Sequence, residues 1–227
     1  MAISWSSSRG QECDENNDAA AVLITEDWVV AIVTDAARSR TACHKGRGGL
    51  APHWSRLIIE RVAEQRAWGS SGAVTSIMQT EQALLRHTHL HEIGSYCCVS
   101  LSCASGDYFI LQCGDCLVGE KVALSDRVSW LCRPATLAEQ FELCAESVTL
   151  KDSVSATMVL TRYLNARRFH QPYCVTGCLA QEESMVICTD GYWRENTTDD
   201  ASILELNASC KTIYKNSDCE NCLIVYR

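Results

Sequence analysis

Residues 16–37 read NNDAAAVLITEDWVVAIVTDAA, and this stretch determines how the rest of the chain is interpreted. Two runs rich in β-branched and apolar residues, Ala19–Thr25 and Trp28–Thr34, are separated by only two acidic residues. Runs of this length on either side of a short polar break are typical of a β-hairpin. Asp35 follows the second run directly, so the sequence predicts a carboxylate at the end of a buried strand.

The rest of the chain groups its helices and strands into blocks. Apolar residues recur at three- and four-residue spacing after Trp54 and again within Ser71–Leu90, which predicts two amphipathic helices. Residues 134–170 are predicted to be largely helical. Further strands are predicted at Tyr96–Cys103, Tyr108–Cys113, Leu117–Leu124, Ser184–Thr189 and Cys222–Tyr226. Because helices do not alternate with strands as a parallel sheet requires, we expect one α+β domain of antiparallel sheets, residues 1–227.

The charge balance excludes several classes of protein. The 227 residues contain 20 Lys and Arg against 28 Asp and Glu, a net charge of −8. Such a chain has no overall positive field to attract nucleic acid or an anionic membrane, so neither is an expected partner. No apolar run approaches the roughly 20 residues of a membrane helix, and the N-terminal MAISWSSSRG lacks the pattern of a signal peptide. We therefore expect a soluble, cytoplasmic protein.

Cysteine is unusually frequent, at 15 residues. Many lie in apolar or alternating runs, where a reduced thiol behaves as a small buried hydrophobic group. This set comprises Cys97, Cys98, Cys103, Cys113, Cys116, Cys188 and Cys222. Alternatively, the two C-x-x-C pairs Cys113/Cys116 and Cys219/Cys222 form a four-thiolate zinc site. The pairs are far apart in the sequence and fall at strand ends, which favours the first interpretation.

Carboxylates gather at the ends of the predicted strands. The residues in these positions are Asp18, Asp35, Asp115, Asp190, Asp218 and Glu220. Several carboxylates that converge at one edge of a sheet repel one another unless a cation neutralises them. Oxygen ligands suit a hard divalent ion, so the pattern indicates a Mg²⁺ or Mn²⁺ site. The alternative explanation is that aspartate favours turns through its own hydrogen bonds.

Taken in order, several short motifs resemble those of the PP2C-type (PPM) metal-dependent serine/threonine phosphatases. The family motifs read roughly N-[EQ]-D-A, D-G-[HMA]-G, G-D-S-R and [CA]-[ST]-D-G-[LI]-W. Their counterparts here are Asn16–Ala19 (NNDA), Asp35–Ala37 (DAA), Gly114–Cys116 (GDC) and Cys188–Trp193 (CTDGYW). The acidic motif that precedes the family's last strand is similar to Asp218–Val225 (DCENCLIV). The likeness runs along the whole chain and is nearest to a divergent bacterial branch.

The resemblance implies a four-layer αββα sandwich, in which helix pairs flank two stacked antiparallel sheets. It also implies a centre of two Mn²⁺ or Mg²⁺ ions, with a looser third ion. The implied metal ligands are Asp18, Asp35, the Ala36 carbonyl, Asp115, Asp190, Asp218 and Glu220, of which Glu220 is preferred to Asp218 as the last ligand. Asp35 and Asp190 are the implied catalytic residues, because the ions they hold activate the water that attacks phosphorus.

Departures from the family pattern leave two functions open. Position 37 is Ala, and Cys13 stands where the family has a phosphate-binding arginine, which leaves Arg9 or Arg38 for that role. The main expectation is a phosphatase that acts on phosphoserine or phosphothreonine in proteins. The alternative is a weakened or inactive relative that binds a phosphoprotein or a partner kinase.

Overall fold

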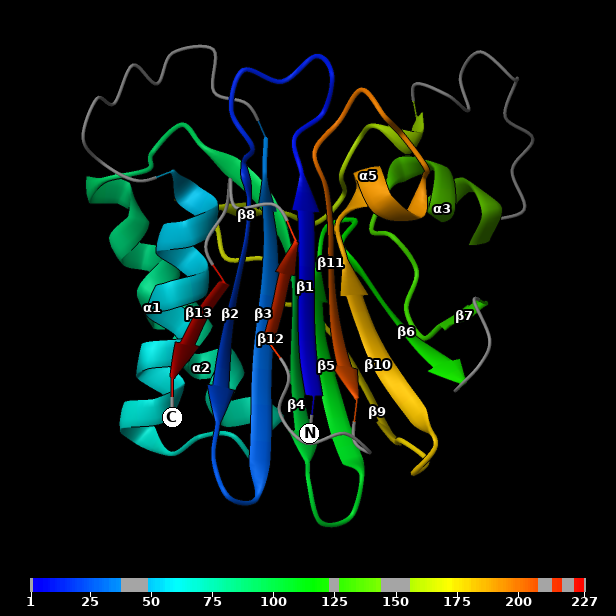
Figure 1. Ribbon diagram of the computed structural model, residues 1–227. Helices are drawn as coiled ribbons and strands as arrows, with labels where there is room; N and C mark the ends of the chain where they lie inside the picture. Colours follow the sequence, from blue (N-terminus) through cyan, green and yellow to red (C-terminus); the bar gives the residue numbers. More distant parts are fainter. Residues whose placement is uncertain are drawn as a thin grey trace.

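Two β-sheets stacked face to face form the centre of the molecule, with a pair of helices on one side (Figure 1). This arrangement confirms the predicted α+β fold. The computed structural model describes residues 2–37, 49–122, 127–143, 156–207, 214–217 (backbone only) and 223–226.

The seven-stranded sheet is built around the predicted hairpin. β2 (Asp18–Ile24) and β3 (Trp28–Ala36) pair antiparallel. The sheet continues beyond β3 through β4, β5 and β9, whose bounds are Ile93–Ser102, Asp107–Cys113 and Tyr173–Cys178. At the opposite edge β13 (Leu223–Tyr226) runs parallel to β2, and the short β8 (Leu164–Asn165) pairs with the start of β4.

The six-stranded sheet joins strands from distant parts of the chain. Its order is β12, β1, β11, β10, β6 and β7, with bounds Tyr214–Ser217, Ala2–Ser8, Ala201–Asn207, Glu183–Cys188, Leu117–Val122 and Val128–Trp130. β1 and β12 are parallel, and the other neighbours are antiparallel. β1 is missing from the sequence-based prediction because AISWSSS carries only two large apolar side chains, Ile3 and Trp5, among serines.

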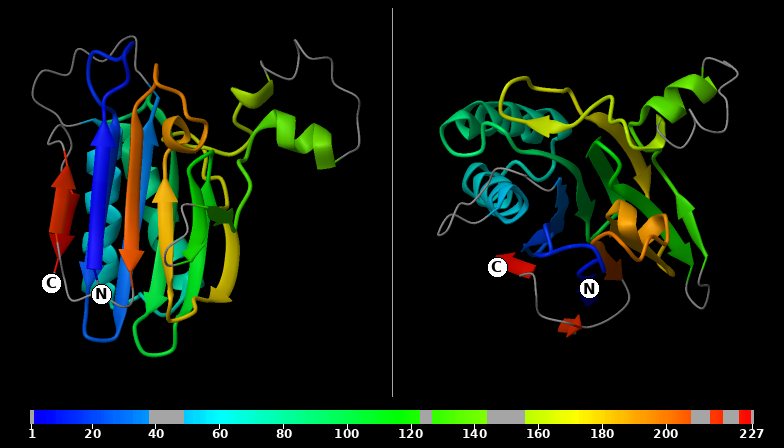
Figure 2. Two further views of the ribbon diagram at one scale, coloured as in Figure 1. Left: turned by 45° about the vertical axis from the view of Figure 1, so that its right-hand side comes forward. Right: turned by 90° about the horizontal axis from the view of Figure 1, so that it is seen from above.

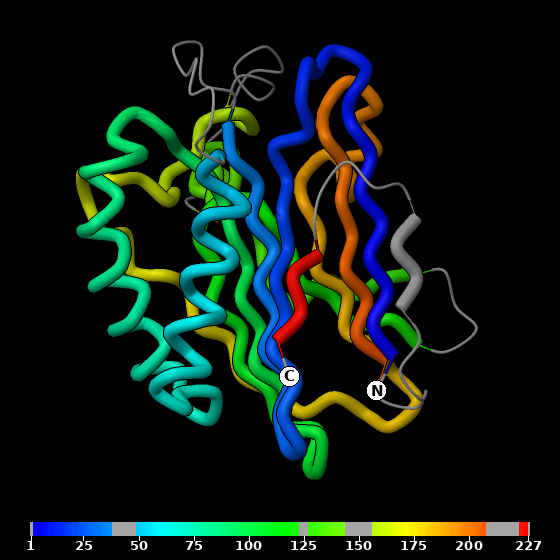
Figure 3. The backbone as a smooth tube through the Cα atoms, turned by 60° about the vertical axis from the view of Figure 1, so that its left-hand side comes forward, coloured from blue at the N-terminus to red at the C-terminus, as the bar shows by residue number. Residues whose placement is uncertain are grey.

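Two helices cover the outer face of the seven-stranded sheet, as predicted (Figure 3). α1 (Leu50–Gln65) buries a stripe of side chains that includes Trp54, Ile58 and Val62 against this sheet. α2 (Ser71–Leu84) is capped by Ser70, whose hydroxyl accepts a hydrogen bond from the backbone N–H of Ala73 in the first turn. A 3-10 turn at Leu85–His87 follows the helix. No helix in the described part of the chain is long and apolar enough to cross a membrane.

The prediction that residues 134–170 are largely helical is wrong for the part the structure describes. A helix forms only over α3 (Leu137–Leu143) and residues 156–157, and the chain then bridges back from Leu160 to Thr136 before β8. α3 buries none of its residues and lies to one side of the sandwich (Figure 2). A second helix pair over the six-stranded sheet is not found among the described residues; residues 144–155 lie outside them.

Alternation along β3 separates two layers of core and positions the site. Val30 and Ile32 face the helices, whereas Val29, Ala31 and Val33 face the other sheet. Because side chains alternate along a strand, Asp35 continues the second series. The hairpin therefore directs this carboxylate into the space between the sheets.

Candidate active site

Asp18, Asp35 and Ser95 lie in one row across the end of the seven-stranded sheet. Asp18 is opposite Asp35 in the β2–β3 ladder, and Asp35 is opposite Ser95 in the β3–β4 ladder. Residues directly opposite each other in an antiparallel pair project to the same face. All three side chains are therefore directed toward the six-stranded sheet.

The six-stranded sheet contributes Thr189 and Asp190, which follow β10. The Thr189 hydroxyl donates a hydrogen bond to Asp18 Oδ2 (2.9 Å) and accepts one from the backbone N–H of Ser202 (3.0 Å) on the neighbouring strand β11. Asp190 opens the four-residue helix α5 (Asp190–Trp193). The two sheets are thus joined at the site through a buried Thr–Asp hydrogen bond.

Asp115 reaches the same place through a turn that only glycine fits. Gly114 has φ +99°, and a Cβ at this position would lie 2.1 Å from Ser95 Oγ. The close approach lets Ser95 Oγ donate to Asp115 Oδ1 (2.7 Å) and accept from the Asp115 N–H (3.2 Å). The indole of Trp193 donates to the Asp115 carbonyl (2.9 Å), so this loop is fixed from both sheets.

These residues border a cleft of about 570 Å³ at the edge of the sandwich. Six carboxylates line it, contributed by strand ends and loops on both sides of the sandwich: Glu12, Asp35, Asp115, Asp190, Asp199 and Asp200. Ala36 also lines the cleft, as do Met158, Leu160 and Tyr163 on one wall. Asp18 lies behind this lining and is only 1% exposed.

Burial and mutual repulsion raise the pKa values of these carboxylates. Burial raises the pKa of Asp18 to about 7, although hydrogen bonds from Ser202 and Thr189 favour its charged form. Burial, reinforced by the charges of Asp18 and Asp190, raises the pKa of Asp35 well above its ordinary value. Burial, reinforced by the charges of Asp115 and Asp199, raises the pKa of Asp190 to about 6, although Arg194 acts in the opposite direction. The site therefore has more negative charge than its hydrogen bonds compensate.

The donor set suits a hard divalent cation. Asp35 and Asp190 line the cleft with carboxylates, and Asp18 is buried beside them. Ala36, which also lines the cleft, would add its backbone carbonyl as a ligand. Oxygen ligands of this kind bind Mg²⁺ or Mn²⁺, and a bound cation would offset both the burial of these charges and their mutual repulsion. The residues present therefore fit the metal that the sequence motifs imply.

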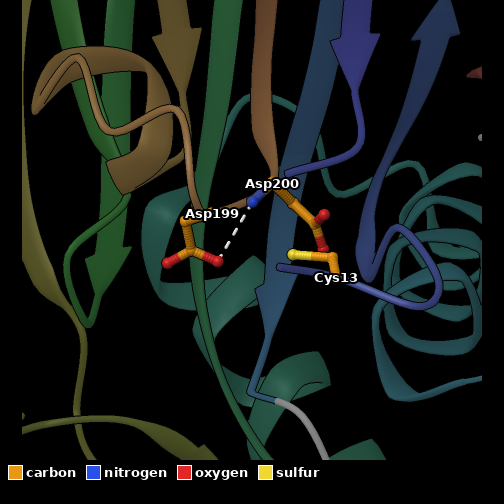
Figure 4. Close-up of side chains that lie close together, drawn as sticks. All are labelled: Cys13, Asp199 and Asp200. Atoms are coloured by element: carbon orange, nitrogen blue, oxygen red, sulfur yellow. Dashed lines mark hydrogen bonds between the residues drawn. The ribbon is translucent and has the colours of Figure 1, made fainter. Parts of the chain in front are cut away.

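A second cluster, of Cys13, Asp199 and Asp200, holds its potential ligand atoms within 4.8 Å of one another (Figure 4). It is the one set of three this compact among the described residues, and it does not coincide with the predicted ligands. Asp200 already accepts hydrogen bonds from the N–H groups of Gly10 (3.0 Å) and Asn17 (2.8 Å). We interpret this cluster as the anchor of the 10–17 loop.

Of the two arginines predicted to bind phosphate, only Arg9 lies in the described part of the chain, and the structure does not place it in the cleft. Arg9 is exposed, donates to the Asp14 carbonyl (3.1 Å), and does not line the cleft. Arg38 lies outside the described residues, as do the predicted last ligands Asp218 and Glu220.

Most of the cysteines that were predicted to be small buried side chains, and that the structure describes, are buried. Cys97, Cys98 and Cys188 are fully buried, whereas Cys103 is exposed. Cys113 packs between the sheet and the helices, but Cys116 packs between the two sheets. Because these two side chains enter different layers of core, they do not form half of a thiolate site; Cys219 and Cys222 lie outside the described residues.

Four polar residues of the site are absent from the sequence-based prediction: Ser95, Thr189, Asp199 and Asp200. Thr189 lies inside the CTDG motif, so its position next to Asp190 in the sequence could have identified it as a site residue. Asp199 and Asp200 immediately precede β11, so recognition of that strand would have placed them at a strand end like the other aspartates. Ser95 has no local signal, because its role depends on the approach of Gly114.

The two stacked sheets and the α1–α2 pair have the fold of solved PP2C-type (PPM) serine/threonine phosphatases. One similar solved structure is a bacterial serine phosphatase, with a TM-score of 0.70 at 12% identity over 94% of this chain and 100% of that one. Another is the Staphylococcus aureus serine/threonine phosphatase, with a TM-score of 0.69 at 13% identity over 90% of this chain and 94% of that one.

The catalytic domain of the serine/threonine protein phosphatase PstP, solved in complex with two manganese ions, is also similar. Its TM-score is 0.61 at 13% identity, covering 89% of this chain and 96% of that one. At such identities the likeness establishes the fold. No family model and no curated protein sequence matches the chain.

Proposed function

We propose that this chain is a metal-dependent phosphatase that hydrolyses phosphoserine or phosphothreonine esters in proteins. The observation that carries the proposal is the position of Asp35 and Asp190, which approach one cleft from the ends of two different sheets. The PP2C-type fold supports it, as does the structure of PstP with two manganese ions.

Asp35, the Ala36 carbonyl, Asp190 and Asp18 would hold two Mn²⁺ or Mg²⁺ ions, together with Glu220 or Asp218. When bound, such ions supply an activated water and neutralise the oxygens of the phosphoryl group. Thr189 keeps the Asp18 carboxylate oriented through its 2.9 Å hydrogen bond.

The cleft can accommodate a phosphorylated side chain together with neighbouring residues of a protein substrate. Its volume of about 570 Å³ is large enough for several side chains, and Met158 and Leu160 give one wall an apolar surface. A partner kinase would supply the phosphoprotein. We place this activity in the cytoplasm because the ten cysteines described are free thiols, most of them buried.

Hydrolysis of p-nitrophenyl phosphate and of a phosphothreonine peptide, with Mn²⁺ added, tests the proposal. We expect Asp35→Asn to abolish turnover, because the neutral amide no longer neutralises a divalent ion. Asp107→Asn is the matched control, since Asp107 is exposed at the start of β5 and bonds only locally to Ser105. Turnover in the unchanged protein no higher than in Asp35→Asn would exclude the enzyme.

A second candidate function is a binding module for a phosphoprotein or kinase. It is favoured by the absence of a described arginine from the cleft lining, since Cys13 occupies the family's phosphate-binding position and Arg9 lies elsewhere. Calorimetry separates the two functions. A folded chain that binds no Mn²⁺ at millimolar concentration would support the module and oppose the enzyme.

A further inference from the structure

Arg194 is a largely buried cation directly beside the acidic cleft. It follows α5, and its side chain is 17% exposed. Its Nε lies 3.2 Å from Asp190 Oδ2, and its Nη2 lies 3.6 Å from Asp115 Oδ2. Nη2 also donates to the Thr157 carbonyl (3.0 Å), and the guanidinium stacks on the ring of Trp193, 4.4 Å from its centroid. Four separate contacts fix the group between two carboxylates.

Each side-chain oxygen of Asp115 already faces a donor from the chain. Its Oδ1 accepts the Ser95 hydroxyl (2.7 Å), and its Oδ2 faces Arg194. Among the described residues, no other lysine or arginine forms an ion pair with Asp115 or Asp190. The guanidinium therefore supplies the positive charge that this pair of carboxylates requires.

We propose that Arg194 permanently occupies the cation position between Asp115 and Asp190, so that no divalent ion binds between these two carboxylates. The sequence-based expectation that Asp115 anchors a third ion is replaced by an internal ion pair. The chain would then load at most two ions, those assigned to Asp35 and its neighbours. The binding of those two ions rests on the proposed function. The ion pair that Arg194 forms does not depend on it.

Mn²⁺ stoichiometry, measured by calorimetry and electron paramagnetic resonance, is the direct test. We expect Arg194→Gln to bind one more Mn²⁺ per chain than the unchanged protein, because it leaves Asp115 and Asp190 without their cation. The double variant Asp115→Asn/Arg194→Gln should lose the additional ion. Arg133→Gln removes an equal charge from an exposed pair with Glu139, and should leave the stoichiometry unchanged. Equal stoichiometry in Arg194→Gln and the unchanged protein, including zero in both, would overturn the proposal.

Thermal unfolding in chelator supplies a readout that requires no metal. Arg194→Gln should lower the melting temperature by roughly 5–10 °C, because it leaves a buried carboxylate pair uncompensated. Adding Asp115→Asn should recover part of this loss, whereas simple loss of packing by Arg194 would not be recovered. Strictly additive effects of the two substitutions would contradict the ion pair. If the unchanged protein binds no Mn²⁺ but Arg194→Gln binds one ion and the coupling is present, the proposed function fails and this inference stands.

Discussion

Thr189 on the six-stranded sheet donates its hydroxyl to Asp18 Oδ2 on the seven-stranded sheet, at 2.9 Å and out of contact with solvent. The same hydroxyl accepts the Ser202 N–H. One small side chain therefore satisfies polar groups of both sheets at the point where the acidic cleft begins.

Thr189→Val preserves the shape of this side chain and removes both hydrogen bonds. We expect the free energy of unfolding to fall by about 1–3 kcal/mol, because the Ser202 N–H and the Asp18 carboxylate remain buried and lose a partner. Thr189→Ser retains the hydroxyl and should lie close to the unchanged protein. Urea denaturation measures both, and equal losses in the two variants would show that the methyl group matters instead of the hydroxyl.

Removal of metal should make stability depend on pH in an unusual direction. The pKa values of Asp18 and Asp190 in the folded chain, about 7 and about 6, exceed the ordinary value of 3.8, so the folded state binds more protons than the unfolded state. These groups therefore favour folding most below about pH 4, and this contribution is lost as the pH rises toward about 7. Each group contributes a slope of at most about 1.4 kcal/mol per pH unit.

Unfolding in urea with chelator present, from pH 5 to pH 8, measures this dependence. We expect stability to decrease over the interval, the decrease to be smaller in Asp18→Asn, and added Mn²⁺ to restore stability near pH 8. A metal-free chain that becomes more stable toward pH 8 would contradict the raised pKa values.

Gly114→Ala should damage the site from the backbone. The residue has φ +99°, and an added Cβ would lie 2.1 Å from Ser95 Oγ, so either the turn or Ser95 must move. We expect a loss of about 1–3 kcal/mol in unfolding free energy and displacement of Asp115. Gly49→Ala is the matched control, because nothing lies within 4 Å of its added Cβ. Similar losses in both variants would exclude the steric explanation.

Asp200→Ala should release the 10–17 loop, which brings Glu12 and Asn17 to the cleft. The substitution removes the acceptor for the N–H groups of Gly10 and Asn17. Hydrogen exchange at these two amides should accelerate by at least tenfold, since loss of a charge-assisted hydrogen bond costs about 1.5–3 kcal/mol. Unchanged exchange at both amides would show that other contacts fix the loop.

The elements with strong local patterns could be predicted from the sequence. The β2–β3 hairpin and the two helices each combine a regular apolar period with clear breaks, and all three are present. β1 could not be predicted, because a serine-rich strand becomes a strand only through its pairing with β11, almost the whole chain away. The region after residue 134 has helix-forming residues, yet α3 buries none of them and therefore has little tertiary support.

The acidic residues of the site were predicted from their positions at strand ends, and the structure brings Asp35, Asp115 and Asp190 to one cleft. Their partners could not be predicted in the same way. Ser95 meets Asp115 and Thr189 meets Asp18 because of strand register and sheet stacking, which depend on the complete fold.

The pairing of β1 also determines the order in which the chain can fold as it is synthesised. β1 lies between β11 and β12, so its first residues must wait for residues beyond 200 before they find partners. The hairpin, α1, α2, β4 and β5 are complete much earlier and can assemble on their own side. Until β10 and β11 emerge from the ribosome, the inner face formed by Val29, Ala31 and Val33 has no opposing sheet. An apolar surface that stays uncovered for so long exposes a nascent chain to aggregation, so we expect this chain to depend on chaperones during translation.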